Sequence, residues 1–281
     1  MLKQRVITAL ILLALLLPAL FAKSALPFAA LTLIAFGAAG WEWARLNGAA
    51  AFALPLGIAL GIACAGAWLA GWATLPPAEV WWATTLVWVL GGGWVLRRGV
   101  AAWPQVPIGV RLGLGLLLLW TAWLALVHAK AVGINFILSA FCLVWAADIA
   151  AYFGGRAFGR RKLAPAISPG KSWEGVWSGM AGALVLALAW SAIEPSVAVD
   201  SKSLFTALAA RTGFVLTACA VVFLVAMSVV GDLFESLVKR SAGAKDSSRL
   251  LPGHGGVLDR IDALLPVLPI ALALVSLRGL S

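Results

Sequence analysis

The chain has 281 residues, of which 63% are hydrophobic and 11% charged, and its formal net charge at pH 7 is +10. Its mean hydropathy of +1.01 excludes a water-soluble domain, which could not cover so apolar a core with polar surface. Runs such as residues 114–119 lack the alternation of apolar and polar side chains that a transmembrane β-barrel requires. We therefore predict an all-α, polytopic transmembrane protein.

Nine apolar stretches, each about long enough to cross the ~30 Å hydrocarbon layer, follow one another along the chain. They cover residues 6–22, 25–44, 50–73, 79–96, 111–127, 131–153, 173–193, 204–230 and 261–278. Lys3 and Arg5 precede the first stretch, as in a signal peptide, but a second stretch follows at once. We therefore expect the first helix to be retained in the protein.

The positive charges predict the orientation of these spans. Placing the N-terminus in the cytoplasm assigns 16 of the 21 Lys and Arg residues to cytoplasmic segments, as the positive-inside rule requires. Two long polar loops, residues 154–172 and 231–260, then face the same compartment. The excess of positive charge also suits an anionic substrate or lipid.

The loop 231–260 concentrates the charges that the rest of the chain lacks. Asp232 stands where a long apolar run ends, and a carboxylate at that depth needs a partner such as a divalent cation. Asp259 and Asp262 are three residues apart and share one helix face, an arrangement that suits Mg²⁺ but also simple stabilisation of a helix N-terminus. Glycines around His254 predict a turn that permits close approach to a ligand.

The loop 154–172 ends in a second polar segment. Ser168 and Lys171 lie at the mouth of the next helix, where a hydroxyl and an ammonium suit phosphate oxygens, although the spacing of a P-loop is absent. Asp148, inside the sixth span, is either a functional residue or a structural hydrogen-bond partner. We expect Glu42, between two tryptophans near a helix end, to be an ordinary interface residue.

Together these residues resemble the phosphatidate cytidylyltransferase family, also called CDP-diacylglycerol synthases. The fixed positions of the family's C-terminal pattern are matched by Ser236, Lys239, Arg240, Lys245, Asp246, His254, Gly255, Gly256, Asp259, Arg260 and Asp262. A second stretch, from Asp148 through Gly155-Arg156 and Ser168 to Glu174-Gly175, also resembles the family. Residues 1–130 resemble it only in hydropathy and in Lys3 and Arg5.

The resemblance implies a membrane-bound enzyme with its active site facing the cytoplasm, located in a bacterial inner membrane. Its reaction would join CTP and phosphatidic acid into CDP-diacylglycerol and pyrophosphate, with Mg²⁺. Residues 1–130 would be N-terminal transmembrane helices and residues 131–281 the catalytic region. The bilayer would be a partner, a nucleic acid would not, and some members of the family form homodimers.

The phosphate of phosphatidic acid is itself a nucleophile, so positioning and cations are expected to supply most of the catalysis. We expect Asp232 and Asp259 to bind Mg²⁺, with Asp246 and Asp262 supporting them or holding a second cation. Catalytic roles are expected for Asp246, Asp262, Lys239 and His254. Substrate binding is expected for Ser168, Lys171, Arg240, Lys245, Gly255, Gly256 and Arg260.

Three alternatives stay open at this point. One is a cytidylyltransferase for another lipid phosphate, such as a prenyl or ether lipid. Another is an anion transporter, although charges inside the spans are few and the polar residues gather on one side. A CDP-alcohol phosphotransferase is disfavoured because its D-G-x2-A-R element is absent from the sequence.

Overall fold

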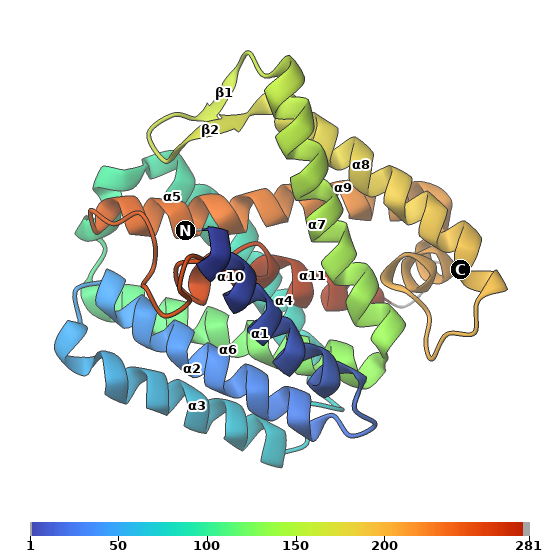
Figure 1. Cartoon of the computed structure of the whole chain (residues 1–281), viewed down its shortest axis with the longest axis horizontal. Helices are drawn as coiled ribbons and strands as arrows, with labels where there is room; N and C mark the ends of the chain where they lie inside the picture. The colour runs from blue at the N-terminus through green and yellow to red at the C-terminus, as the bar shows by residue number, and fades with distance from the viewer. Residues whose placement is uncertain (1, 278–281) are drawn as a thin grey trace.

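The computed structural model describes residues 2–277, without the side chains of residues 2 and 3 (Figure 1). The side chain of Lys3 and the end of the last predicted span, at residue 278, therefore lie outside what the structure describes. Within residues 2–277, seven helices are long and apolar enough to cross a membrane. They are α1 (Leu2–Phe21), α2 (Leu26–Leu46), α3 (Ala53–Leu69), α6 (Ile108–Val132), α7 (Ile134–Phe158), α8 (Trp173–Ile193) and α9 (Leu204–Ser241). The predicted all-α, polytopic architecture is confirmed, and the orientation of the termini stays a prediction.

The two other predicted spans take a different form. Residues 79–96 form α4 (Ala78–Leu86), a π-helical segment (Val87–Gly92) and α5 (Gly93–Arg98). Residues 261–278 correspond to α10 (Leu258–Ile261) and the short α11 (Leu264–Ser276), whose central residues are buried. Short 3₁₀ turns occupy Ala50–Phe52, Val100–Gln105 and Glu194–Ser196.

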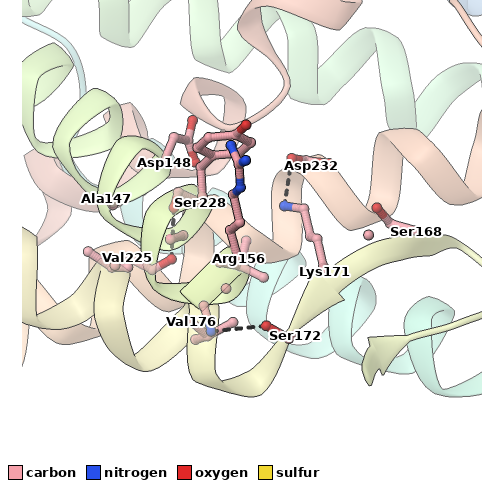
Figure 2. A pocket seen from close by; sticks show the side chains of 17 residues that line it. Ala147, Asp148, Arg156, Ser168, Lys171, Ser172, Val176, Val225, Ser228 and Asp232 are labelled. Carbon is pink, nitrogen blue, oxygen red and sulfur yellow. Dashed lines mark hydrogen bonds and ion pairs between the residues drawn. The ribbon is translucent and has the colours of Figure 1, made fainter. Parts of the chain in front are cut away.

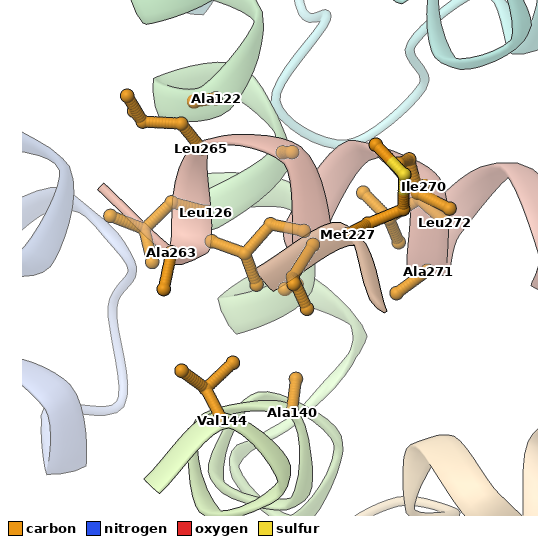
Figure 3. Packing of buried hydrophobic residues seen from close by; sticks show 14 of the residues in the cluster. Ala122, Leu126, Ala140, Val144, Met227, Ala263, Leu265, Ile270, Ala271 and Leu272 are labelled. Carbon is orange, nitrogen blue, oxygen red and sulfur yellow. The ribbon is translucent and has the colours of Figure 1, made fainter. Parts of the chain in front are cut away.

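Helix α11 is surrounded by the long helices, and its apolar side chains form part of the core. Figure 3 shows Ile270 and its neighbours on α11 packed against Leu126 of α6, Val144 of α7 and Met227 of α9. Ile270 is fully buried, and most apolar side chains along this helix are nearly so. Between membrane helices close packing rather than transfer from water supplies the attraction, and this packing fixes the end of α11 that follows Asp262.

A short β-hairpin joins α7 to α8 at one end of the bundle (Figure 1). Strands β1 (Lys162–Ala164) and β2 (Ser168–Ser172) pair antiparallel. Ser172 caps α8, because its hydroxyl accepts a hydrogen bond from the Gly175 N–H at 3.1 Å. The Glu174 carboxylate accepts the N–H groups of Arg160 and Arg161 at 3.0 and 3.2 Å. These contacts fix the direction in which β2 presents its side chains.

Helices α7 and α8 approach one another closely through glycines. A Cβ on Gly179 would lie 2.9 Å from the Ala147 carbonyl oxygen, and one on Gly175 would lie 3.0 Å from that of Ala151. Such contacts are tighter than van der Waals packing allows, so glycine permits the approach. The two helices thus form one wall beside β2.

Helix α9 extends well past the predicted end of its span. It runs to Ser241, with non-helical backbone at Gly213. Asp232, Lys239 and Arg240 consequently lie on a helix, and the loop predicted to begin at residue 231 begins after Ser241. The other predicted loop also starts later, because α7 continues to Phe158.

Candidate functional site

A cavity of about 500 Å³ lies between α7, β2, α8 and α9. Polar side chains from three of these elements line it: Asp148 and Arg156 from α7, Ser168 and Lys171 from β2, and Asp232 from α9 (Figure 2). The cavity therefore brings together three of the predicted site residues, Ser168, Lys171 and Asp232, from segments more than 60 positions apart in the sequence.

An ion pair crosses this cavity. Lys171 Nζ lies 2.6 Å from Asp232 Oδ2, and the two side chains are 26% and 31% exposed. The second oxygen, Asp232 Oδ1, accepts a hydrogen bond from the Ser236 hydroxyl at 3.3 Å, one helical turn further on. Both groups remain open to a ligand, because neither is fully enclosed by protein.

A second ionic cluster lies further along α9. The ammonium of Lys239 contacts the carboxylate of Glu235 and lies 2.6 Å from Asp259 Oδ1. Asp259 Oδ2 accepts the N–H groups of Ser247 and Gly256 at 2.9 and 2.8 Å. Burial opposes ionisation of Asp259, but Lys239 and these N–H groups outweigh it and lower the pKa of Asp259 to about 2. The carboxylate is therefore ionised at neutral pH.

Asp262 links the two clusters through the backbone. Its carbonyl oxygen packs against Gly231, the residue before Asp232, so closely that a Cβ on Gly231 would overlap it. Asp262 Oδ1 accepts the N–H of Ala263 at 2.8 Å, at the entry to α11. The contact fixes the start of α11 beside the part of α9 that carries Asp232.

Glu42 differs from its prediction. The expected interface residue is fully buried, and its carboxylate accepts four hydrogen bonds from a loop more than 200 residues away. The donors are the hydroxyls of Ser247 (3.2 Å) and Ser248 (2.6 Å) and the N–H groups of Val257 (2.9 Å) and Leu258 (2.8 Å). The interpretation as a surface residue is wrong, because an acid inside an otherwise apolar helix has to find donors in the interior.

The glycine-rich turn is shaped by the protein's own carboxylates. Gly255 has φ +83°, and a Cβ there would lie 2.5 Å from Asp259 Oδ2. At Gly256 a Cβ would overlap Glu42 Oε1 and the Ser247 hydroxyl. The sequence predicted that these glycines permit close approach to a ligand, whereas in the structure they permit close approach of Asp259 and Glu42.

The remaining predicted residues lie outside the 500 Å³ cavity. Lys245 and Asp246 line a separate open hollow of about 730 Å³, together with Arg45 and Arg249. Arg240 donates to the carbonyl oxygens of Ile167 and Ala244, both at 3.3 Å, and so joins the hairpin to the loop.

The other two lie on or beside the turn. His254 donates its backbone N–H to the Leu251 carbonyl at 2.8 Å, and Arg260 is exposed on α10. Helix α1 touches this turn, where the Thr8 hydroxyl donates to the Pro252 carbonyl oxygen at 2.9 Å.

Within residues 2–277, no three His, Cys, Asp or Glu side chains are gathered as a ready metal site. The donor chemistry nevertheless fits a hard cation, because Asp232 and Asp259 each offer carboxylate oxygens, the ligands that Mg²⁺ prefers. Each already faces a cation, Lys171 or Lys239, at 2.6 Å. Carboxylates that attract an ammonium this closely present negative charge to any cation in the site.

Comparison with known proteins identifies the family. The sequence model of the cytidylyltransferase family matches residues 3–278. The chain belongs to this family. A phosphatidate cytidylyltransferase of Pseudomonas aeruginosa is 42% identical over 287 residues, which cover 99% of this chain and 98% of the relative. One from Haemophilus influenzae is 39% identical, with 96% of each chain covered.

These comparisons confirm the predicted family and extend the likeness. The motifs placed it in residues 148–262, and residues 1–130 resembled the family in little more than hydropathy. The full-length matches instead cover the N-terminal as well as the C-terminal half of this chain. A shorter match, to the chloroplastic phosphatidate cytidylyltransferase 5 of Arabidopsis thaliana, is 40% identical over 148 residues, 53% of this chain and 33% of the relative.

Proposed function

We propose that this cytidylyltransferase transfers CMP from CTP to phosphatidic acid, giving CDP-diacylglycerol and pyrophosphate for phospholipid synthesis. The observation that carries the proposal is the full-length likeness to phosphatidate cytidylyltransferases of two bacteria. The Lys171–Asp232 pair in a cavity beside the membrane-spanning helices supports it. The bacterial relatives favour an inner-membrane location, and the distribution of Lys and Arg along the sequence favours a cavity on the cytoplasmic side.

The reaction makes one phosphorus–oxygen bond and breaks another. A phosphate oxygen of phosphatidic acid attacks the α-phosphorus of CTP, and the bond from that phosphorus to the bridging oxygen breaks as pyrophosphate leaves with the bonding electrons. Two anions have to meet, so the protein's cations lower the barrier by neutralising charge. Lys171 lines the cavity as such a cation, and Arg156 brings a guanidinium to the same wall. Ser168 offers a hydroxyl beside them.

Asp232 and Asp259 are the proposed ligands of Mg²⁺, with Asp246 and Asp262 supporting them or holding a second cation. Bound Mg²⁺ would neutralise the triphosphate and stabilise the charge of the departing pyrophosphate. Lys171 and Lys239 orient the two proposed carboxylate ligands through contacts of 2.6 Å. Lys245, Arg240 and Arg260, with His254, Gly255 and Gly256, are proposed for substrate contacts along the loop.

The lipid reaches the site from the bilayer. Ile149, Tyr152 and Phe153 of α7 are 58%, 60% and 63% exposed, which is expected of side chains that face acyl chains. Tyr152 also lines the cavity with Arg156. A phosphate head group could therefore reach Arg156 and Lys171 while its acyl chains stay among the apolar side chains of α7. Homodimer formation is a further prediction, made from the family alone.

Radiolabelled CTP, phosphatidic acid and Mg²⁺ test the proposal with the purified protein. We expect labelled CDP-diacylglycerol and one pyrophosphate per turnover. Prenyl and ether lipid phosphates in parallel reactions test the alternative acceptor. No lipid product with any acceptor would overturn the proposal, and anion flux in proteoliposomes without CTP turnover would indicate a transporter instead.

A further inference from the structure

The buried carboxylate of Glu42 comes from the N-terminal half of the chain, yet all four of its hydrogen-bond donors belong to the segment 247–258. Oε1 accepts from the Ser248 hydroxyl and the Val257 N–H, and Oε2 accepts from the Ser247 hydroxyl and the Leu258 N–H. Within the described residues Glu42 has no ion pair, so hydrogen bonds alone satisfy its buried oxygens. Buried polar groups satisfied in this way hold their partners rigidly.

Glu42 and Asp259 hold the same loop from two sides. The Ser247 hydroxyl lies 3.2 Å from Glu42 Oε2 and 2.9 Å from Asp259 Oδ2, so its single proton is shared between the two carboxylates. Gly256 donates its N–H to Asp259, and Glu42 Oε1 occupies the space that a Cβ on Gly256 would need. A displacement of Glu42 would therefore move the groups that orient Asp259.

We propose that Glu42 is a positioning residue for the reaction, acting on Asp259 through Ser247 and the N–H groups at the start of α10. This rests on the proposed function, in which Asp259 holds Mg²⁺. Glu42 does not touch the proposed ligand site itself. It sets the position of the Asp259 carboxylate from helix α2, which explains in physical terms why the N-terminal helices are part of the working enzyme.

Glu42→Gln is the discriminating variant, because it keeps the shape of the side chain and replaces one acceptor oxygen with a donor group. All four protein groups that face Glu42 can donate, so the new amide would leave at least one N–H or hydroxyl without an acceptor. Residues that orient metal ligands change activity by about 10–100-fold when they are replaced. We expect kcat to fall by about that factor and the KM for CTP to stay within about twofold, because positioning acts on the transition state.

The Mg²⁺ concentration that gives half-maximal rate is the second readout, and we expect it to rise. The third requires no turnover. Lys245 and Arg249 are exposed in the loop, so limited trypsin digestion of the full chain in detergent reports how firmly the loop is held. Cleavage at these two positions should be faster in Glu42→Gln. The matched control is Glu79→Gln, an exposed glutamate on α4, which should match wild type in all three readouts.

A double-mutant cycle with Ser247→Ala tests the route of the effect. If Ser247 carries it, the double variant loses less kcat than the product of the two single losses. If the two single losses multiply in the double variant, the route through Ser247 is wrong. If Glu42→Gln has the kcat, the Mg²⁺ dependence and the tryptic cleavage rates of wild type, the proposal as a whole is wrong. Should Glu42→Gln fail to fold, Ser248→Ala, which removes one donor, has to show the same faster cleavage or the proposal fails.

The closing experiment separates this proposal from the proposed reaction. If the wild-type protein made no CDP-lipid, the proposed function would fail while the tryptic rates still reported whether Glu42 holds the loop. If wild type were active and Glu42→Gln were indistinguishable from it, the reaction would stand and the positioning role would fail.

Discussion

Lys239 is the residue whose loss should be most costly to the site. Its ammonium contacts Glu235 and lies 2.6 Å from Asp259 Oδ1, and the side chains of Lys239, Glu235 and Asp259 are 12%, 3% and 6% exposed. Lys239→Met keeps the length and the helix propensity of the side chain on α9. It leaves two carboxylates close together without the cation that joins them.

Removing one partner of a buried ion pair costs about 3–5 kcal/mol, because the other partner stays buried and uncompensated. Two carboxylates lose their partner here, but Asp259 retains the N–H groups of Ser247 and Gly256. Within the described residues Glu235 has no hydrogen-bond donor other than the Lys239 ammonium, so most of the cost falls on Glu235. We expect Lys239→Met to lower the free energy of unfolding by about 3 kcal/mol at neutral pH.

Glu235→Gln is the matched variant. It preserves the Lys239–Asp259 pair, and the amide oxygen of the new side chain can still accept a hydrogen bond from the Lys239 ammonium. Its cost should therefore stay below about 1.5 kcal/mol. Lys23→Met, in an exposed turn between α1 and α2, should be neutral within about 0.5 kcal/mol.

Equilibrium unfolding of the purified proteins in mixed detergent micelles, followed by tryptophan fluorescence, measures these differences. The chain has 15 Trp residues, several of them buried, so the signal reports helix packing. The reasoning would be refuted if Lys239→Met cost no more than Glu235→Gln, because the ammonium would then not be the group that makes burial of the two carboxylates tolerable.

Three further outcomes are expected. Asp232→Asn should fold normally but lose more than about 100-fold in CDP-lipid synthesis, as a lost metal ligand would, and near wild-type activity with unchanged Mg²⁺ dependence would contradict the metal role. Gly256→Ala should cost about 1–3 kcal/mol of stability, because its Cβ would overlap Glu42 and Ser247, whereas Gly113→Ala, with open space around it, should cost nothing measurable. The pKa of Asp259 is lowered to about 2 from 3.8, so its contribution to stability is complete above about pH 4 and disappears as the pH falls through about 2. Unfolding measured between pH 5 and pH 2 should show a shallower loss in Asp259→Asn than in wild type.

The sequence predicted the class of fold and part of the site, because the signals for these are local. Hydropathy along each stretch identified the spans, and the long loops located Lys171 and Asp232, which the structure joins at 2.6 Å. The form of the two least regular spans was harder to predict. Hydropathy does not indicate the π-helical segment at Val87–Gly92 or the short length of α11. The continuation of α9 to Ser241 does have a local signal, because residues 233, 234, 237 and 238 are apolar at helical spacing.

The misinterpretation of Glu42 has a different origin. Its partner Leu258 lies 216 residues further along the chain, and no periodicity or spacing in one sequence reports a contact over that distance. The charge pattern did contain a usable signal, since an acid within an apolar helix requires buried donors or a cation. The two flanking tryptophans were interpreted as residues of the membrane interface. Trp43 is instead buried and stacks on Phe234 of α9, with ring centroids 6.0 Å apart.

The loop after α9 consequently has two kinds of segment. Ser247 and residues 255–258 are fixed from both sides by Glu42 and Asp259, and their glycines are required by those contacts. Lys245, Asp246 and Arg249 project from the fixed points into the open hollow. If the cations Lys245 and Arg249 bind the polyphosphate of CTP, their rigidly held backbone would lose little entropy on binding. Substitutions in the fixed segment should therefore change kcat, and substitutions of Lys245 and Arg249 should change the KM for CTP.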